Sequence, residues 1–184
     1  SAPRTSVVSM PGDRYRPSLV LVAGTVARCA IFLEITIVGV ALPALIREFD
    51  TSASRVAWTV TVYTLAIAAA VVPLGRLGDR IGHRKVLIYS LSTLIVTSVL
   101  CGVSNGLTML LIARALQGLS AAALLPSTQA IVANAYEGPA RTKALGQMLG
   151  FQALVFASGP VLGGLLIAGP GWRFVFFSTA PFAL

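Results

Sequence analysis

Long apolar runs separated by short polar gaps dominate the hydropathy pattern of this chain. The complete runs cover about residues 19–42, 56–74, 86–103, 107–133 and 144–168, and another begins at 174 and continues to 184. About 20 apolar residues in a helix cross the hydrocarbon core of a bilayer, and a helix satisfies its own backbone polar groups. The pattern therefore predicts an all-α membrane protein with five complete spans and the truncated start of a sixth.

The two ends of the chain differ in character. Residues 1–17 are predicted to form a polar tail, and residues 18–184 are predicted to form one transmembrane bundle. The chain begins at Ser1 without a methionine and stops inside an apolar run, so we expect a fragment of a longer protein. The first apolar run is too long and too charged for a signal peptide.

Composition narrows the class of protein further. Hydrophobic residues make up 56% of the chain and charged residues only 11%, which favours a membrane protein over a soluble domain. The net charge of +8 invites a nucleic-acid interpretation, but the cations lie in the gaps between apolar runs. We therefore expect no nucleic-acid partner. The sequence has no cluster of metal ligands and no catalytic motif, so we expect neither a metal site nor an enzyme.

The cations are distributed unequally between the two sides of the predicted bundle. Nine lysines and arginines lie in the tail and in the gaps after the second and fourth spans, and three lie on the opposite side. The side richer in lysine and arginine is normally cytoplasmic. This count predicts that the N-terminus and the segments 76–85 and 137–143 face the cytoplasm.

The gap after the second span contains glycines and an acid among its cations. It reads Gly75-Arg76-Leu77-Gly78-Asp79-Arg80-Ile81-Gly82-His83-Arg84-Lys85. Gly82 permits a sharp reversal of the backbone, and Asp79 could pair locally or cap another helix. A loop that only sets topology needs neither residue. We interpret Gly75, Asp79, Arg80, Gly82 and Arg84 as a conformational-switch loop, and His83 as a tolerated surface substitution.

This segment resembles the signature loop of the major facilitator superfamily, whose pattern is G-x-L-[AG]-D-R-x-G-[RK]-[RK]. The segment 33–43 resembles the first-helix motif L-D-x-T-I-V-N-V-A-L-P of the drug:proton antiporter branch with fourteen helices, and 114–118 resembles the fourth-helix motif R-x-x-Q-G. The fifth span carries a pattern typical of antiporters at Gly150, Gly159, Pro160, Gly163 and Gly164. The resemblance covers nearly all residues from 19 to 184.

The resemblance implies both a fold and a function. The fold would be the N-terminal six-helix bundle of a major facilitator transporter, built as two inverted three-helix repeats. The function would be export of small apolar or cationic compounds, as in multidrug resistance, from a bacterial inner membrane. Such a protein needs no cofactor, since the proton gradient drives it. Its partners would be the substrate, protons, the lipid bilayer and the C-terminal half of the same transporter.

The glycines of the fifth span also have a physical interpretation of their own. Gly146 and Gly150 are four residues apart, as are Gly159 and Gly163. Each pair should give the helix a flat face against a neighbouring helix. Pro160 removes a backbone hydrogen bond and can bend the helix. Ordinary close packing in a bundle remains an equally open explanation of this pattern.

Two opposite charges inside the spans are the strongest candidates for function. Glu34 in the first span and Arg114 in the fourth each lie about eight residues from the outer helix end, roughly 12 Å deep. Ionisable residues in membrane helices often mark proton or substrate pathways. We predict that Glu34 carries the coupling proton and Arg114 tunes it. A static structural ion pair is the alternative.

Arg28 and Gln117 are the remaining candidates, as substrate contacts or charge partners. Arg28 lies six residues before Glu34, about a third of a turn off the same face. It could neutralise Glu34, bind an anionic substrate or face the missing half. Arg28 therefore favours a second hypothesis, export of one metabolite or of an anionic compound. A non-transporting receptor built on a transporter fold is a third hypothesis, because fold does not fix function.

Overall fold

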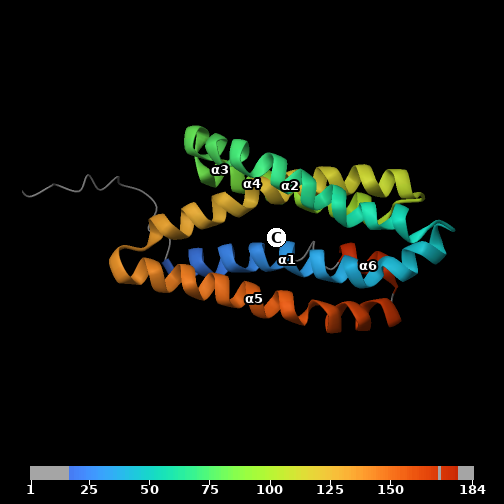
Figure 1. Ribbon diagram of the computed structural model, residues 1–184. Coiled ribbons are helices and arrows are strands. Elements are labelled where there is room, and N and C mark those ends of the chain that lie inside the picture. The colour runs from blue at the N-terminus through green and yellow to red at the C-terminus, as the bar shows by residue number, and fades with distance from the viewer. Residues whose placement is uncertain (1–16, 170, 178–184) are drawn as a thin grey trace, which may run out of the picture.

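The computed structural model describes residues 17–169 and 171–177, and it is built from helices (Figure 1). The helices are α1 (Pro17–Glu48), α2 (Ala53–Ile81), α3 (His83–Gly102), α4 (Leu107–Ala135), α5 (Gly138–Ala168) and α6 (Trp172–Phe177). The first five are long and apolar enough to cross a membrane. Residues 1–16 of the predicted tail, and residues 178–184 of the predicted sixth span, lie outside the described residues.

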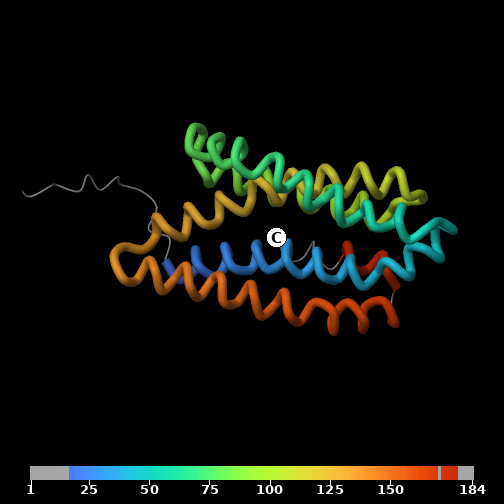
Figure 2. Tube along the Cα trace, viewed as in Figure 1, coloured from blue at the N-terminus to red at the C-terminus, as the bar shows by residue number. Residues whose placement is uncertain are grey.

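The helices form two layers of three. In Figures 1 and 2, α2, α3 and α4 lie together on one side, and α1, α5 and α6 lie on the other. The tightest pairings are α2 with α4 and α1 with α5, and α1 also packs against α4 between the layers. Exchanging α1 with α4, α2 with α5 and α3 with α6 maps this set of pairings onto itself. That symmetry is what two inverted three-helix repeats would produce.

Helical structure extends beyond the apolar runs that predicted it. The second run covers 56–74, whereas α2 continues to Ile81 through two arginines and an aspartate. The predicted switch loop is therefore not a loop: Gly82 alone separates α2 from α3. Its φ of 97° lies in the left-handed region that glycine adopts easily, so the chain reverses at one residue. Hydropathy finds only the membrane core of a helix, because the ends of the helix carry polar residues.

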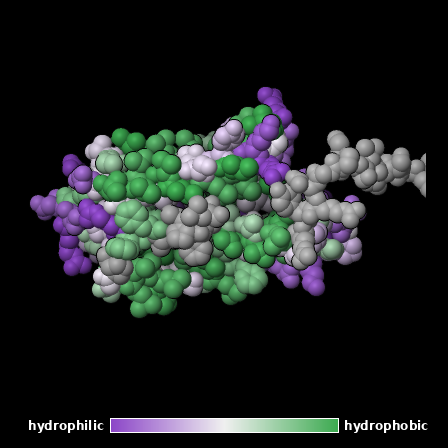
Figure 3. Space-filling model, turned by 180° about the vertical axis from the view of Figure 1, so that it is seen from behind, coloured by the Kyte–Doolittle hydropathy of each residue, from purple (hydrophilic) through white to green (hydrophobic). Residues whose placement is uncertain are grey.

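The molecular surface has the polarity expected for a bilayer environment. On the face seen in Figure 3, hydrophobic residues cover the middle of the molecule and hydrophilic residues gather at both ends. Large apolar side chains are well exposed on the long helices, including Leu65 of α2 at 61% and Leu154 and Leu165 of α5 at 69% and 68%. Soluble monomers rarely expose so much contiguous apolar surface. The chain is a multi-pass membrane protein.

Helices α2 and α4 come into close contact at Gly118, one turn from Arg114. A Cβ atom on Gly118 would come within 2.5 Å of the Tyr63 carbonyl oxygen and 2.8 Å of the Ala66 Cβ. Any larger residue at position 118 would therefore push the two helices apart. Glycine there allows the backbones to touch, which is the usual means of tight helix packing in membranes.

Candidate functional site

Glu34 and Arg114 meet between the two layers. The Arg114 Nη1 atom donates to Glu34 Oε1 at 3.1 Å, and both side chains are fully buried. Glu34 comes from α1 and Arg114 from α4, and their contact agrees with the prediction that the two charges can meet at one level. A carboxylate buried here without a cation would be strongly unfavourable, so each charge lowers the free energy of burying the other.

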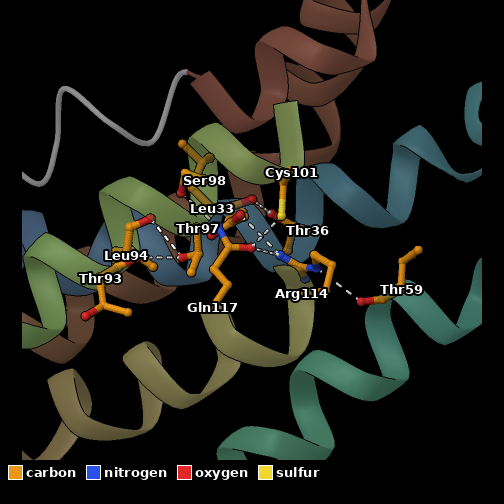
Figure 4. A network of polar contacts seen from close by, with 11 residues as sticks. Leu33, Thr36, Thr59, Thr93, Leu94, Thr97, Ser98, Cys101, Arg114 and Gln117 are labelled. Atoms are coloured by element: carbon orange, nitrogen blue, oxygen red, sulfur yellow. Dashed lines mark hydrogen bonds and ion pairs between the residues drawn. The ribbon is translucent and has the colours of Figure 1, made fainter. Parts of the chain in front are cut away.

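Arg114 is held by further contacts, which Figure 4 shows from close by. The Nη1 atom also donates to Gln117 Oε1 at 2.8 Å, and Nε donates to the Thr59 backbone carbonyl at 3.1 Å. The guanidinium lies over the Tyr63 ring, with Cζ 4.0 Å from the ring centroid, a cation–π geometry. These contacts come from α2 and α4, so Arg114 stays anchored to the α2–α4 layer independently of Glu34.

Polar atoms around the pair have unused hydrogen-bonding capacity. Among the described residues, the buried atoms Glu34 Oε2, Arg114 Nη2 and Tyr63 Oη have no hydrogen-bond partner. Buried polar groups are normally satisfied, so several unsatisfied atoms at one place are unusual. A site in which Glu34 keeps one free oxygen can accept a proton without first breaking its contact to Arg114.

Gln117 is found as a partner of the charges, one of the two roles the sequence allowed. Its Oε1 accepts from Arg114, and its Nε2 donates to Ser98 Oγ on α3 at 2.8 Å. The Cys101 thiol lies 3.5 Å from the same Oε1 atom, and both cysteines are free. The network therefore reaches from α1 through α4 to α3.

Sequence reasoning missed Tyr63 and Ser98, and it missed the carbonyl of Thr59. Each lies within an apolar span, where hydroxyl-bearing residues gave no charge signal. A usable signal exists for Tyr63: it is a phenol within the second apolar run, and a phenol is amphipathic and usually lies at the membrane surface rather than in its core.

Arg28 lies against α4 and α5 and not beside Glu34. Its Nε donates to Gln152 Oε1 on α5 at 2.9 Å, and its Nη1 lies 2.8 Å from the Leu125 carbonyl and 3.5 Å from Thr128 Oγ1 on α4. It forms no ion pair with Glu34, so the hypothesis that it neutralises Glu34 is wrong. The 120° between the two positions turns the arginine toward the α4–α5 side of α1.

The corner between α2 and α3 is held by a local pair. The His83 Nε2 atom lies 3.0 Å from Asp79 Oδ1, one turn apart across Gly82. His83 is not a surface substitution, because its side chain is only 16% exposed and packs directly on Gly78. The glycine at 78 leaves room for the imidazole, and a Cβ there would collide with the ring. Asp79 thus pairs locally, one of its two predicted roles.

The other predicted switch residues surround this corner. Gly75 packs against Pro126 of α4, and a Cβ on Gly75 would lie 3.5 Å from the proline Cβ. Arg80 is exposed in the last turn of α2, and Arg84 is exposed in the first turn of α3. The corner therefore contacts α4 through Gly75, while its cations lie on the surface at the end of the bundle.

The fifth-helix glycines divide into two groups. Gly159 and Gly163 face α1: a Cβ on Gly163 would lie 3.1 Å from Ile37 Cγ2, and one on Gly159 would collide with Thr36. Gly150 and Gly164 have nothing within 4 Å of such a Cβ, and Pro160 is exposed. Gly146 is also open, so the predicted groove at 146 and 150 has no neighbour among the described residues.

Helix α1 carries both the buried acid that pairs with Arg114 of α4 and the residues that contact the α5 glycines. α1 presents Glu34 to α4 and, two and three residues later, Thr36 and Ile37 to the α5 glycines. Buried ion pairs inside a membrane bundle are characteristic of proteins that move ions or solutes across it. The fold and the site together define a polytopic membrane protein of the transporter class.

Comparison with known families agrees with this class. The Major Facilitator Superfamily matches residues 24–184, which is most of the chain. The chain belongs to the Major Facilitator Superfamily, and the resemblance seen in its motifs is confirmed. Members of this family are transporters and not enzymes.

Curated relatives match along nearly the whole chain. The tetracenomycin C resistance and export protein of Streptomyces glaucescens is 34% identical over 173 residues, covering 94% of this chain and 32% of the relative. The drug efflux pump JefA of Mycobacterium tuberculosis is 31% identical, covering 90% and 33%. A multidrug resistance protein B homolog from M. tuberculosis is 33% identical, covering 99% and 34%. The chain spans about a third of the length of these relatives.

A solved structure shares the fold. It is a bacterial homolog of the human lysosomal transporter Spinster, with a TM-score of 0.72 and 19% sequence identity. The match covers 94% of this chain and 42% of that chain. At this identity the likeness concerns the fold alone, and it agrees with the predicted major facilitator bundle.

Proposed function

We propose that the full-length transporter containing this chain exports small organic compounds in exchange for protons, with Glu34 as the proton carrier. The observation that carries the proposal is the fully buried Glu34–Arg114 pair between the two helix layers. The names of the relatives, which include drug efflux and multidrug resistance proteins, support export as the direction of transport. Proton coupling rests on the pair and on its surroundings.

The contacts of the pair suggest how a proton would act. The bonds of Arg114 to Gln117 and Thr59 do not involve Glu34, so they can persist when Glu34 is protonated. Protonation of Glu34 removes the charge attraction at 3.1 Å and leaves α1 more weakly held to α4. The layer containing α1 could then shift relative to the layer containing α4. This is the step that would couple proton binding to a conformational change.

Substitution of Glu34 by glutamine tests the proposal directly. Glutamine is nearly isosteric with a protonated glutamate, but its amide cannot ionise. Full-length protein is reconstituted in proteoliposomes, and substrate movement is followed with and without an imposed pH gradient. We expect Glu34→Gln to retain substrate exchange in the absence of a gradient and to lose accumulation driven by the gradient.

Glu48 provides a matched control on the same helix. It forms an exposed ion pair with Arg173 at 2.8 Å, so Glu48→Gln makes the same chemical change outside the buried site. Gradient-driven transport should survive in Glu48→Gln. Full gradient-driven accumulation by Glu34→Gln would place the coupling group elsewhere. If the wild-type protein moves no substrate at all, the receptor hypothesis is favoured over transport.

The proposal includes a position in the cell and a partner. We infer that the protein lies in the plasma membrane, the inner membrane of a bacterium, with its N-terminus in the cytoplasm, on the strength of the lysine and arginine distribution. The second half of the same transporter would complete the substrate cavity. It would cover helices such as α5, in which only Ala144, Met148, Gly159 and Gly163 are buried.

A further inference from the structure

Along the interface between α1 and α5, which we call the seam, a cation is followed by an aromatic pair. Both helices run in the same direction along the molecule (Figure 2). Arg28 lies against Gln152, and one helical turn further along Phe32 meets Phe156 with ring centroids 6.3 Å apart in an edge-to-face arrangement. After these two levels the glycine contacts of α5 close the seam.

Arg28 differs from Arg114 in having no acid beside it. Among the described residues its hydrogen-bond acceptors are the Gln152 amide, the Leu125 carbonyl and the Thr128 hydroxyl, all of them neutral. Only 6% of Arg28 is exposed. A buried guanidinium that is solvated by neutral dipoles alone is strongly attractive to an anion, because ion pairing recovers part of the free energy lost on leaving water.

The aromatic pair specifies what kind of anion fits. Phe32 is half-buried and Phe156 is 46% exposed, so the pair presents ring surface at the edge of the seam. Aromatic rings pack against the rings of Phe in edge-to-face or offset geometries, and a guanidinium binds a carboxylate through charge-assisted hydrogen bonds. A ligand that uses both features has a flat aromatic body with an acidic group at one end.

We propose that Arg28, Gln152, Phe32 and Phe156 form a binding site for aromatic acids, with Arg28 taking the anionic group and the two rings taking the aromatic body. This assignment rests on the proposed transport function, since it names a substrate class for it. It gives the transporter a preference for anionic over neutral forms of the same compound. It also assigns Arg28 a role separate from the proton carrier.

A matched pair of probes tests the site: 2-naphthoate and its neutral methyl ester. Each is radiolabelled, and its binding to purified full-length transporter is measured by equilibrium dialysis without a proton gradient, with empty micelles subtracted. The wild type should bind the acid more tightly than the ester. Loss of one charge-assisted contact should weaken acid binding by about tenfold or more in Arg28→Gln, and change ester binding by less than about threefold.

Two further variants keep the test decisive if Arg28→Gln does not fold. Gln152→Glu retains Arg28 but replaces the amide whose Oε1 lies 2.9 Å from Arg28 Nε with a carboxylate. This internal anion would neutralise Arg28, so the variant should lose the preference for the acid over the ester. Arg47→Gln removes an exposed cation of the same helix, which donates to the Pro43 carbonyl, and should leave the preference intact.

The outcomes separate this site from the transport proposal. If the wild type binds the acid and the ester equally, or binds neither, the proposed site is wrong. Equal binding would result if a carboxylate from another part of the transporter already paired with Arg28. Equal loss of acid and ester in Arg28→Gln also overturns it, since that would indicate a general packing role. If the acid binds through Arg28 but a pH gradient drives no transport, the site stands and the transport proposal fails.

Discussion

Removing Arg114 from the buried pair should destabilise the transporter far more than removing any exposed cation. Methionine at 114 has a similar length but no donor, so Glu34, Gln117 and the Thr59 carbonyl all lose their bonds to the guanidinium. The main loss is that a fully buried carboxylate is left without a cation. Breaking a buried ion pair from one side costs about 3–5 kcal/mol in the free energy of unfolding.

A double-mutant cycle isolates the interaction between the two charges. In Glu34→Gln, Arg114 retains the acceptors Gln117 and Thr59, so we expect a smaller loss of about 1–3 kcal/mol. The double variant Glu34→Gln with Arg114→Met contains neither charge, and its loss should be well below the sum of the two single losses. A coupling free energy of at least about 1.5 kcal/mol is expected.

Denaturant titration of the purified full-length protein, followed by tryptophan fluorescence, measures these differences. The exposed pair Arg173–Glu48, with side chains 40% and 41% exposed, is the control cycle and should give about 0–1 kcal/mol. The loss in Arg114→Met should also shrink at acidic pH, because a proton then neutralises the isolated Glu34. Single losses that add within about 0.5 kcal/mol, together with no pH dependence, would refute the reasoning.

Three further predictions concern packing, the corner and topology. Gly163→Leu should lower the thermal stability by about 1–3 kcal/mol because its side chain meets Ile37, whereas Gly164→Leu on the open face should have a smaller effect; equal losses in thermal unfolding would contradict this. Asp79→Asn should slow transport while leaving the substrate Kd nearly unchanged, since Asp79 contacts His83 at the end of the bundle; a parallel fall in affinity would rule out a switch role. In a background without native cysteines, a cysteine at Asn105 should react with an impermeant thiol reagent added outside intact cells and one at Arg84 should not; the reverse would invert the topology.

The matching level of the two charges along the bundle could be predicted from sequence because a helix has a fixed rise per residue. Counting residues from the ends of two apolar runs was enough to place Glu34 and Arg114 at one level, and the structure brings them to 3.1 Å. The five long helices follow from the same regularity, since each apolar run of sufficient length can only cross the bilayer as a helix.

Rotation about the helix axis could not be predicted in the same way. Arg28 was a candidate partner for Glu34 from spacing alone, yet it turns toward Gln152 and Leu125. The neighbour of each helix face depends on how the helices pack, and the sequence alone does not specify this packing. The glycines of α5 illustrate the same limit, because Gly163 touches α1 while Gly164 does not.

Local charge patterns misled the interpretation of the corner between α2 and α3. The closely spaced arginines of this segment predict a polar loop, but arginine is a good helix former and the bilayer surface accommodates its charge. The departure of His83 from the family pattern predicts a surface substitution, whereas in the structure its ring occupies the space that Gly78 leaves by lacking a Cβ. The relevant signal is Gly78, five residues before His83, but its contact with the histidine ring follows only from the folded corner.

The buried pair connects the two helix layers. α1 is held to α5 through Gly159 and Gly163, contacts that contain no titratable group, and to α4 through the Glu34–Arg114 ion pair. In the proposed coupling step, protonation of Glu34 would weaken this link between the layers and leave the glycine contacts within the α1–α5 layer unchanged. Because Arg28 of the proposed aromatic-acid site contacts both α4 and α5, movement of α1 with α5 relative to α4 would alter its contact to the Leu125 carbonyl while keeping its contact to Gln152. Proton and substrate would thus act on one boundary from two separate positions along α1, without having to touch each other.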